Sequence, residues 1–141
     1  MLYFLLRYVM ISNEMFGGDT IRVKIKGYLK NNNDKEIINF DEKGIRNKDK
    51  ITFSSLNVKY VIKYDDSKVY LTREGKDYIN NFAFNKKKSE CNYLLKKHDF
   101  NVDIDIKVID IDISDKYVYV KYVVIDSNIE YEFKIEASDI L

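Results

Sequence analysis

Aspartates alternate with isoleucines in the stretch NVDIDIKVIDIDISD, residues 101–115, and they are the first candidates for chemistry in this chain. On a strand, Asp103 and Asp105 would share one face with their Cα atoms about 7 Å apart, and Asp110 and Asp112 repeat the spacing. Two such carboxylates could share a cation. Calcium, however, needs six to eight oxygen ligands, usually from a loop with a glycine and a bidentate glutamate at fixed positions. That loop pattern is missing here, so we expect a solvated strand face and no metal site.

A nucleophile with its base, or a zinc site, would need histidine and cysteine. The chain has one histidine, His98, and one cysteine, Cys91, which are too few for a zinc site. His98 lies in the polar connection LLKKHDF, and Cys91 is expected to be a small, semi-buried apolar residue. No P-loop, dinucleotide-binding glycine pattern or HExxH motif occurs. The sequence therefore gives no support for an enzyme, a metal or a cofactor.

Tyrosine is abundant, with 12 residues in a chain of 141. A buried tyrosine needs a partner for its hydroxyl, so several in one interior indicate tips at the rim or a partly polar, hydrated interior. Arg73 is in phase with Val69 and Leu71, so it points inward or sits where its strand emerges at the rim. An inward arginine beside tyrosines would anchor an anion or carboxylate in a small cavity. The candidate ligand-binding residues are therefore Arg73, Tyr60, Tyr93, Tyr122 and Tyr131.

The overall charge excludes two classes of partner. The chain has 24 basic and 23 acidic side chains, a formal net charge of +1, so no overall field attracts a nucleic acid backbone or an anionic membrane. The lysine run at residues 86–88 lacks an aromatic platform and is interpreted as a solvated hairpin. A single cysteine rules out an internal disulfide and favours a cytoplasmic location.

The first residues, MLYFLLRYVMI, are apolar except for Arg7. This run is shorter than the ~20 residues that span a bilayer, and it lacks the flanks of a secretory signal. Residues 1–19 are therefore interpreted as an extension that either docks as a short strand or helix or is poorly ordered. Residues 20–141 contain no proline and no flexible linker, and they are expected to form a single domain.

Period-two alternation of apolar and polar residues recurs from Thr20 onward, because successive strand side chains point to opposite faces. Turn signals at about every 8–12 residues, without a 3.6-residue period, predict an all-β antiparallel barrel or sandwich of about eight to ten strands. The expected strands are residues 21–26, 35–40, 50–55, 57–64, 68–73, 80–88, 91–95, 101–115, 117–124 and 128–136. The expected turns include residues 31–34, 42–44, 65–67, 74–76 and 126–128.

The alternation changes phase inside residues 101–115. Apolar residues occupy even positions from Val102 to Val108 and odd positions from Ile109 to Ile113. A β-bulge absorbs one residue in this way and bends the strand. The alternative, a tight break between two strands, is less favoured because no turn residue stands at the junction.

Opposite charges indicate where the barrel closes. The outward face of the first expected strand is basic, and that of the last is acidic except for Lys134. In an up-and-down barrel these strands are neighbours, and facing opposite charges contribute about 0.2–1 kcal/mol each. The sequence thus predicts a seam between the first and last strands, against the alternative of two independent solvated faces. The residues of this predicted seam are Arg22, Lys24, Lys26, Glu130, Glu132 and Glu136.

The segment VKYVIKYDDSKVYLTREGKDYINNFAFNKKKSECNY resembles the YwiB-like family of small bacterial proteins. In its members a strand–turn–strand unit comes first, and an Arg-x-Gly motif comes after it, matched here by Arg73, Glu74 and Gly75. A phenylalanine and a tyrosine come next, matched by Phe84 and Tyr93. The likeness extends over about residues 21–136. Where the family has a Pro-aromatic-Gly turn, this chain has His98, Asp99 and Phe100, so that turn must be built differently.

The resemblance implies a domain of unknown function with a calycin-like, that is lipocalin-like, β-barrel. It implies no activity and no functional residues. Calycins hold small hydrophobic ligands in their barrels, but the lipocalin Gly-x-Trp signature cannot occur in a chain without tryptophan. Two hypotheses follow. The protein binds one small, partly apolar ligand in the barrel, or the barrel is solid and acts through its surface as an interaction or structural module.

Overall fold

The computed structural model describes residues 20–140, which form eleven β-strands without a helix. The strands are β1 (Thr20–Asn31), β2 (Ile37–Asn47), β3 (Lys50–Ser55), β4 (Val58–Tyr64), β5 (Val69–Glu74), β6 (Tyr78–Phe84), β7 (Glu90–Leu95), β8 (Phe100–Ile104), β9 (Ile106–Ser114), β10 (Tyr117–Val124) and β11 (Ile129–Asp139). This is slightly more than the eight to ten strands predicted. The predicted N-terminal extension, residues 1–19, lies outside the described residues. Over the described range, no helix is long and apolar enough to cross a membrane.

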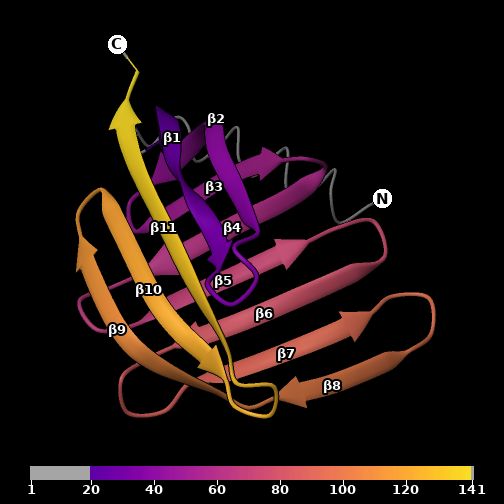
Figure 1. Ribbon diagram of the computed structural model, residues 1–141. Coiled ribbons are helices and arrows are strands. Elements are labelled where there is room, and N and C mark those ends of the chain that lie inside the picture. Colours follow the sequence, from indigo (N-terminus) through magenta and orange to yellow (C-terminus); the bar gives the residue numbers. More distant parts are fainter. Residues whose placement is uncertain (1–19, 141) are drawn as a thin grey trace.

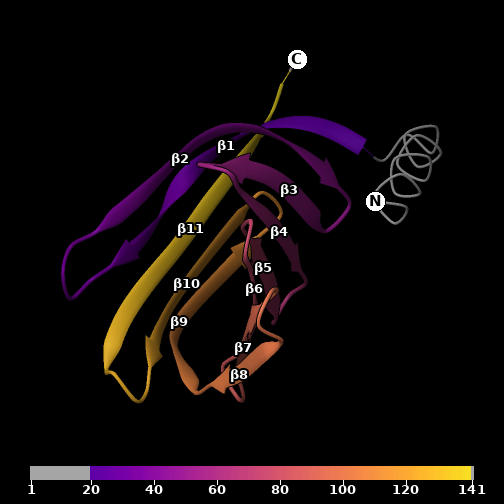
Figure 2. The same ribbon diagram turned by 90° about the vertical axis from the view of Figure 1, so that its right-hand side faces the viewer.

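All eleven strands belong to one antiparallel sheet with the order β8-β7-β6-β5-β4-β3-β2-β1-β11-β10-β9. The sheet curls into two facing layers, which Figure 1 shows crossing each other and Figure 2 shows from the side. The two edges, β8 and β9, follow each other directly along the chain. The result is a nearly closed antiparallel barrel, so the predicted all-β barrel is confirmed.

Alternation decides which side chains fill the barrel. On β4, Tyr60, Ile62 and Tyr64 are buried, and on β10 the inward residues are Val118 and Val120, followed by Tyr122. Burying an aliphatic or aromatic side chain of this size stabilises the fold by about 1.5–3 kcal/mol. Hydrophobic burial on alternate residues is therefore what selects this sheet over a helical fold.

Two glycines allow close packing where β1 and β2 bend over the barrel (Figure 2). A Cβ on Gly27 would overlap the carbonyl oxygen of Lys134 on β11. A Cβ on Gly44 would lie 2.6 Å from the carbonyl oxygen of Thr52 and 3.0 Å from the Cβ of Phe53. The predicted turn at residues 42–44 is therefore wrong. Gly44 lies inside β2, where it makes room for a neighbouring strand instead of reversing the chain.

Most predicted turns are confirmed. Chain reversals follow Asn31, Tyr64, Glu74 and Val124, close to the expected positions. In the β4–β5 turn the carboxylate of Asp65 accepts hydrogen bonds from the backbone amides of Ser67 and Lys68, and these bonds lower the pKa of Asp65. The β7–β8 turn places Asp99 in the left-handed region with φ of 49°. Aspartate tolerates that region better than most residues.

Residues 101–115 form two strands, so the prediction of one strand is wrong. β8 ends at Ile104, Asp105 forms a corner, and β9 begins at Ile106. The carbonyl of Asp105 accepts a hydrogen bond of 2.9 Å from the backbone amide of Ile125, which ties the corner to the end of β10. β8 pairs with β7, whereas β9 pairs with β10, so the chain crosses from one layer to the other at this point.

The predicted bulge between Val108 and Ile109 is confirmed. Tyr122 lies opposite Val108 and Lys121 lies opposite Asp110, so Ile109 is the extra residue. Its side chain is 50% exposed, which means that Ile109 is not part of the barrel wall, contrary to expectation. The bulge restores the inward phase of the apolar residues that follow it.

The prediction that the first and last strands are neighbours is confirmed, because β1 pairs with β11. The charges of the predicted seam meet only in part. Lys26 lies opposite Glu136, but Lys24 lies opposite Ser138. Both lysines also approach Asp41 of β2, with Nζ–Oδ distances of 3.9 Å for Lys24 and 3.8 Å for Lys26. Such exposed ion pairs contribute little, so hydrogen bonding and the buried face hold this junction.

Candidate functional site

Arg73 lies on β5 among inward-facing side chains. Its cross-strand neighbours are Tyr60 on β4 and Asn80 on β6. One guanidinium nitrogen, Nη2, donates to the hydroxyl of Tyr60 at 3.4 Å, and the guanidinium carbon lies 5.4 Å from the centre of the Tyr60 ring. The Nε atom is buried and has no hydrogen-bond partner. Arg73 is therefore an inward, half-buried cation that rests on an aromatic ring.

A second inward arginine, Arg46 on β2, has a different environment. Its Nη2 lies 3.3 Å from Oδ1 of Asp139, and Nζ of Lys116 lies 3.3 Å from Oδ2 of the same carboxylate. These two cations lower the pKa of Asp139, against the opposing effect of its desolvation. Nearby, the hydroxyl of Tyr64 donates to the backbone carbonyl of Asp115 at 2.6 Å and so links β4 to the β9–β10 turn. The Arg46 end of the barrel is thus closed by paired charges.

No such pairing exists for Arg73. Within residues 20–140, the ion pairs include no carboxylate for its guanidinium. A cation that is partly removed from water without a counter-ion has an unfavourable solvation energy, which a bound anion would relieve. This contrast between two inward arginines is the clearest functional signal in the interior.

Two further candidate tyrosines, Tyr122 and Tyr131, lie in the opposite layer. Tyr122 on β10 is 4% exposed, and its ring stacks on Tyr131 of β11 with centroids 5.4 Å apart. Burial raises the pKa of Tyr122, whereas the positive charge of Arg73 acts to lower it. The charge of Arg73 therefore acts electrostatically on a buried hydroxyl of the other layer.

Tyr93 on β7 is half-buried and lies opposite Asn80 in the sheet. Its ring stacks on Tyr78 of β6, with ring centroids 5.7 Å apart. The thiol of Cys91 points to the Oδ1 atom of Asn80 at 3.5 Å, and burial raises its pKa to about 11. Cys91, expected to be a small, semi-buried apolar residue, is buried in the core.

The structure thus brings the five candidate residues onto the inner face of one barrel. Tyr60 contacts Arg73, Tyr122 contacts Tyr131, and Tyr93 lies opposite Asn80, the cross-strand neighbour of Arg73. Sequence reasoning missed Tyr78 and Asn80. Counting back in steps of two from the buried Phe84 would have identified both as inward.

The middle of the barrel is filled with aromatic rings. Phe40 lies 5.2 Å from Phe53 and 4.9 Å from Tyr60, measured between ring centroids, and Phe53 stacks on Tyr60. The interior on the Phe40 side of Tyr60 is therefore packed with rings. An inward guanidinium beside tyrosines could hold an anionic group, with an apolar body against the rings.

The aspartates of residues 101–115 do not gather. Asp103 accepts a hydrogen bond from the Asn92 side chain, Asp105 forms the corner, and Asp110 and Asp112 are exposed on β9. Over the described part of the chain, no three histidine, cysteine, aspartate or glutamate side chains are arranged to hold a metal ion.

Two comparisons with known proteins found a match. A protein family described as a domain of unknown function (DUF1934) matches residues 9–140. Among solved structures, the crystal structure of the ywiB protein from Bacillus subtilis matches with a TM-score of 0.59 and 15% sequence identity. The match covers 87% of this chain and 93% of that one. At this identity the likeness concerns the fold alone. No curated protein sequence matches.

Proposed function

The chain belongs to the family described as a domain of unknown function (DUF1934), and from this premise we propose that it binds one small, partly apolar anion inside its barrel. The observation that carries the proposal is the inward Arg73, whose guanidinium has an aromatic ring beneath it and no carboxylate partner among residues 20–140. Arginine is well suited to a carboxylate because its planar fork can donate two parallel hydrogen bonds.

The proposed site consists of five side chains with distinct roles. Arg73 binds the anionic group, and Tyr60 holds the guanidinium from below. Tyr93, Tyr122 and Tyr131 pack against the apolar body of the ligand, and their hydroxyls supply further hydrogen bonds. The proposal includes a single domain at residues 20–141 and a cytoplasmic location, which the buried, unpaired thiol of Cys91 favours.

Binding can be tested with pairs of probes that differ in charge alone. Hexanoate and phenylacetate, each compared with its neutral amide, are added to the full-length protein and the melting temperature is measured. We expect the acids to raise the melting temperature and the amides to have little effect. A ligand that binds only the folded state stabilises it by about 2.7 kcal/mol at about 100 times its Kd.

The matched control exchanges the two inward arginines. Arg73→Met should abolish the response to the acids, whereas Arg46→Met, at the other end of the barrel, should retain it. A native mass spectrum of gently purified protein should show a bound acidic molecule that is absent from the Arg73→Met variant. Equal responses to acid and amide, or an unchanged response in Arg73→Met, would contradict the proposal.

The alternative function is a solid barrel that acts through its outer surface. The aromatic packing around Phe40 supports it. The absence of a co-purifying mass together with no response to any probe would favour this alternative.

A further inference from the structure

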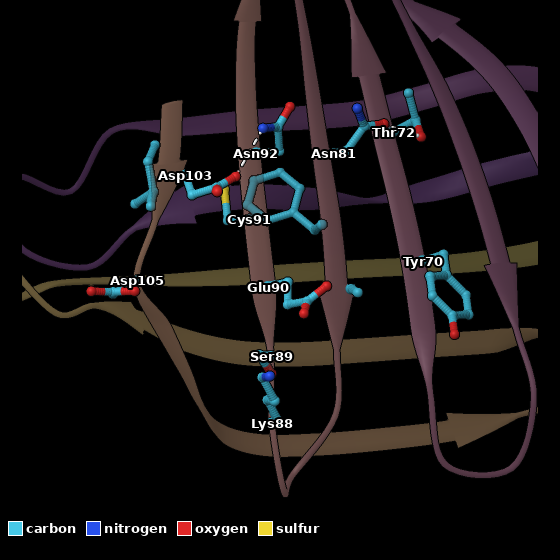
Figure 3. A pocket seen from close by; sticks show the side chains of 13 residues that line it. Tyr70, Thr72, Asn81, Lys88, Ser89, Glu90, Cys91, Asn92, Asp103 and Asp105 are labelled. Carbon is cyan, nitrogen blue, oxygen red and sulfur yellow. Dashed lines mark hydrogen bonds between the residues drawn. The ribbon is translucent and has the colours of Figure 1, made fainter. Parts of the chain in front are cut away.

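A hollow of about 520 Å³ lies on the outer face of β5–β8, beside the corner at Asp105 (Figure 3). It is separate from the interior around Arg73, because most of its lining side chains belong to the outward phase of these strands. Its volume is in the usual range for sites that bind small molecules. We propose that this hollow binds a neutral sugar, one ring of a carbohydrate.

The hollow exists because a small side chain separates two larger ones. In the sheet, Tyr70 on β5 lies opposite Ala83 on β6, and Ala83 lies opposite Glu90 on β7. The methyl group of Ala83 forms a low floor between the phenol ring and the carboxylate. Tyr70 is 47% exposed, so its ring is accessible from this floor.

A row of polar side chains lies on the same outer face, two residues along each strand from the Tyr70–Ala83–Glu90 row. Thr72, Asn81, Asn92 and Asp103 lie opposite one another on β5, β6, β7 and β8. The Thr72 hydroxyl donates to Oδ1 of Asn81 at 2.9 Å, and Nδ2 of Asn92 donates to Oδ1 of Asp103 at 2.9 Å (Figure 3). Among the described residues, the side-chain amide nitrogen of Asn81 can therefore still donate a hydrogen bond to a ligand, and the side-chain amide oxygen of Asn92 can still accept one.

This combination matches the chemistry of a sugar ring. One face of a pyranose carries C–H groups that pack on an aromatic ring, whereas its edge carries hydroxyl groups that both donate and accept hydrogen bonds. Tyr70 supplies the ring. Asn81, Asn92 and Glu90 supply donors and acceptors that are already oriented by the sheet.

Charge argues for a neutral ligand. The hollow is lined by the carboxylates of Glu90, Asp103 and Asp105, and Lys88 is its one lysine or arginine. The excess of carboxylates opposes a phosphate or a carboxylate ligand, whereas hydroxyl groups donate readily to carboxylates. The outer site and the interior site are therefore expected to select different ligands.

The test measures binding of maltotriose, cellotriose, xylotriose and chitotriose to the full-length, isotope-labelled protein by nuclear magnetic resonance. We expect at least one trisaccharide to bind with a Kd of about 1 mM and to shift amide signals of β5–β8 selectively. Tyr70→Ala should weaken binding about tenfold, equivalent to about 1.4 kcal/mol. Tyr28→Ala, which removes an outward tyrosine on β1, should leave the affinity unchanged.

A second variant keeps Tyr70 and the polar row intact. Ala83→Leu fills the floor of the hollow and should abolish binding while the amide spectrum remains that of a folded barrel. The inference is overturned if none of the four sugars shifts the signals of β5–β8 at about 10 times the expected Kd, or if both Tyr70→Ala and Ala83→Leu bind as the unchanged protein does.

Discussion

At the scale of single residues, the two inward arginines differ in what surrounds them. Arg46 faces a carboxylate at 3.3 Å, whereas Arg73 has an aromatic ring and a tyrosine hydroxyl. An ion pair contributes modestly to stability, but an inward cation without a counter-ion is unfavourable in the free protein. Groups that destabilise the free protein are often those that serve binding.

This contrast predicts opposite effects on stability. Arg46→Met should lower the free energy of unfolding by about 1 kcal/mol, because Asp139 loses one of its two cations. Arg73→Met should leave the stability of the ligand-free protein unchanged or raise it by up to about 1 kcal/mol. Urea denaturation of the two variants measures both values. If Arg73→Met lost as much stability as Arg46→Met, then Arg73 would be a structural residue.

At the scale of elements, one corner and one bulge shape the edge of the barrel. The corner at Asp105 sends the chain from β8 to β9, and the bulge at Ile109 bends β9 against β10. Because Ile109 is half-exposed, its side chain contributes little to the core. The bend of β9 therefore comes from the extra backbone residue. The aspartates between the isoleucines keep the outer face of β9 in water.

Removal of the bulge should be more harmful than replacement of its side chain. Deletion of Ile109 gives β9 a regular register with β10 and keeps Ile111 facing inward, but it removes the bend. We expect a loss of about 1–2 kcal/mol in the free energy of unfolding. Ile109→Thr should change this value by less than about 0.5 kcal/mol. Urea denaturation compares the two, and an equal loss in both would assign the effect to the side chain.

At the scale of the whole molecule, the pairing of β1 with β11 joins the two ends of the described chain. It connects the run of hairpins from β1 to β8 with the three strands β9, β10 and β11. Other neighbours in the sheet are consecutive along the chain. The sheet therefore has one strand pairing between segments far apart in the chain, and Gly27 lies within it.

Gly27→Ala should weaken this junction. The added Cβ would overlap the backbone carbonyl of Lys134, so β1 and β11 would have to separate. We expect a loss of about 2–3 kcal/mol. Gly75→Ala is the control, because its Cβ would meet the ring of Tyr78, a side chain that can move, and the loss should stay below about 1 kcal/mol. Thermal denaturation measures both, and similar losses would contradict a special role for the junction.

The sequence by itself determined the local features of this protein. Alternation identified most strands and their inward residues, the polar turns, and the bulge at Ile109, because these depend on neighbours along the chain. It also placed Arg73 in phase with apolar residues. The predicted turn at residues 42–44 failed because a glycine that reverses the chain and one that makes room for a neighbour, such as Gly44, look alike in sequence.

The tertiary structure alone decided what depends on distant segments. It located the free edges at β8 and β9, set the register of β1 against β11, and paired Arg46 but not Arg73 with a carboxylate. It also aligned Tyr70, Ala83 and Glu90 across three strands. Alternation indicates which face a side chain takes, but it does not indicate which strand lies beside it, because closure of a sheet is a property of the whole chain.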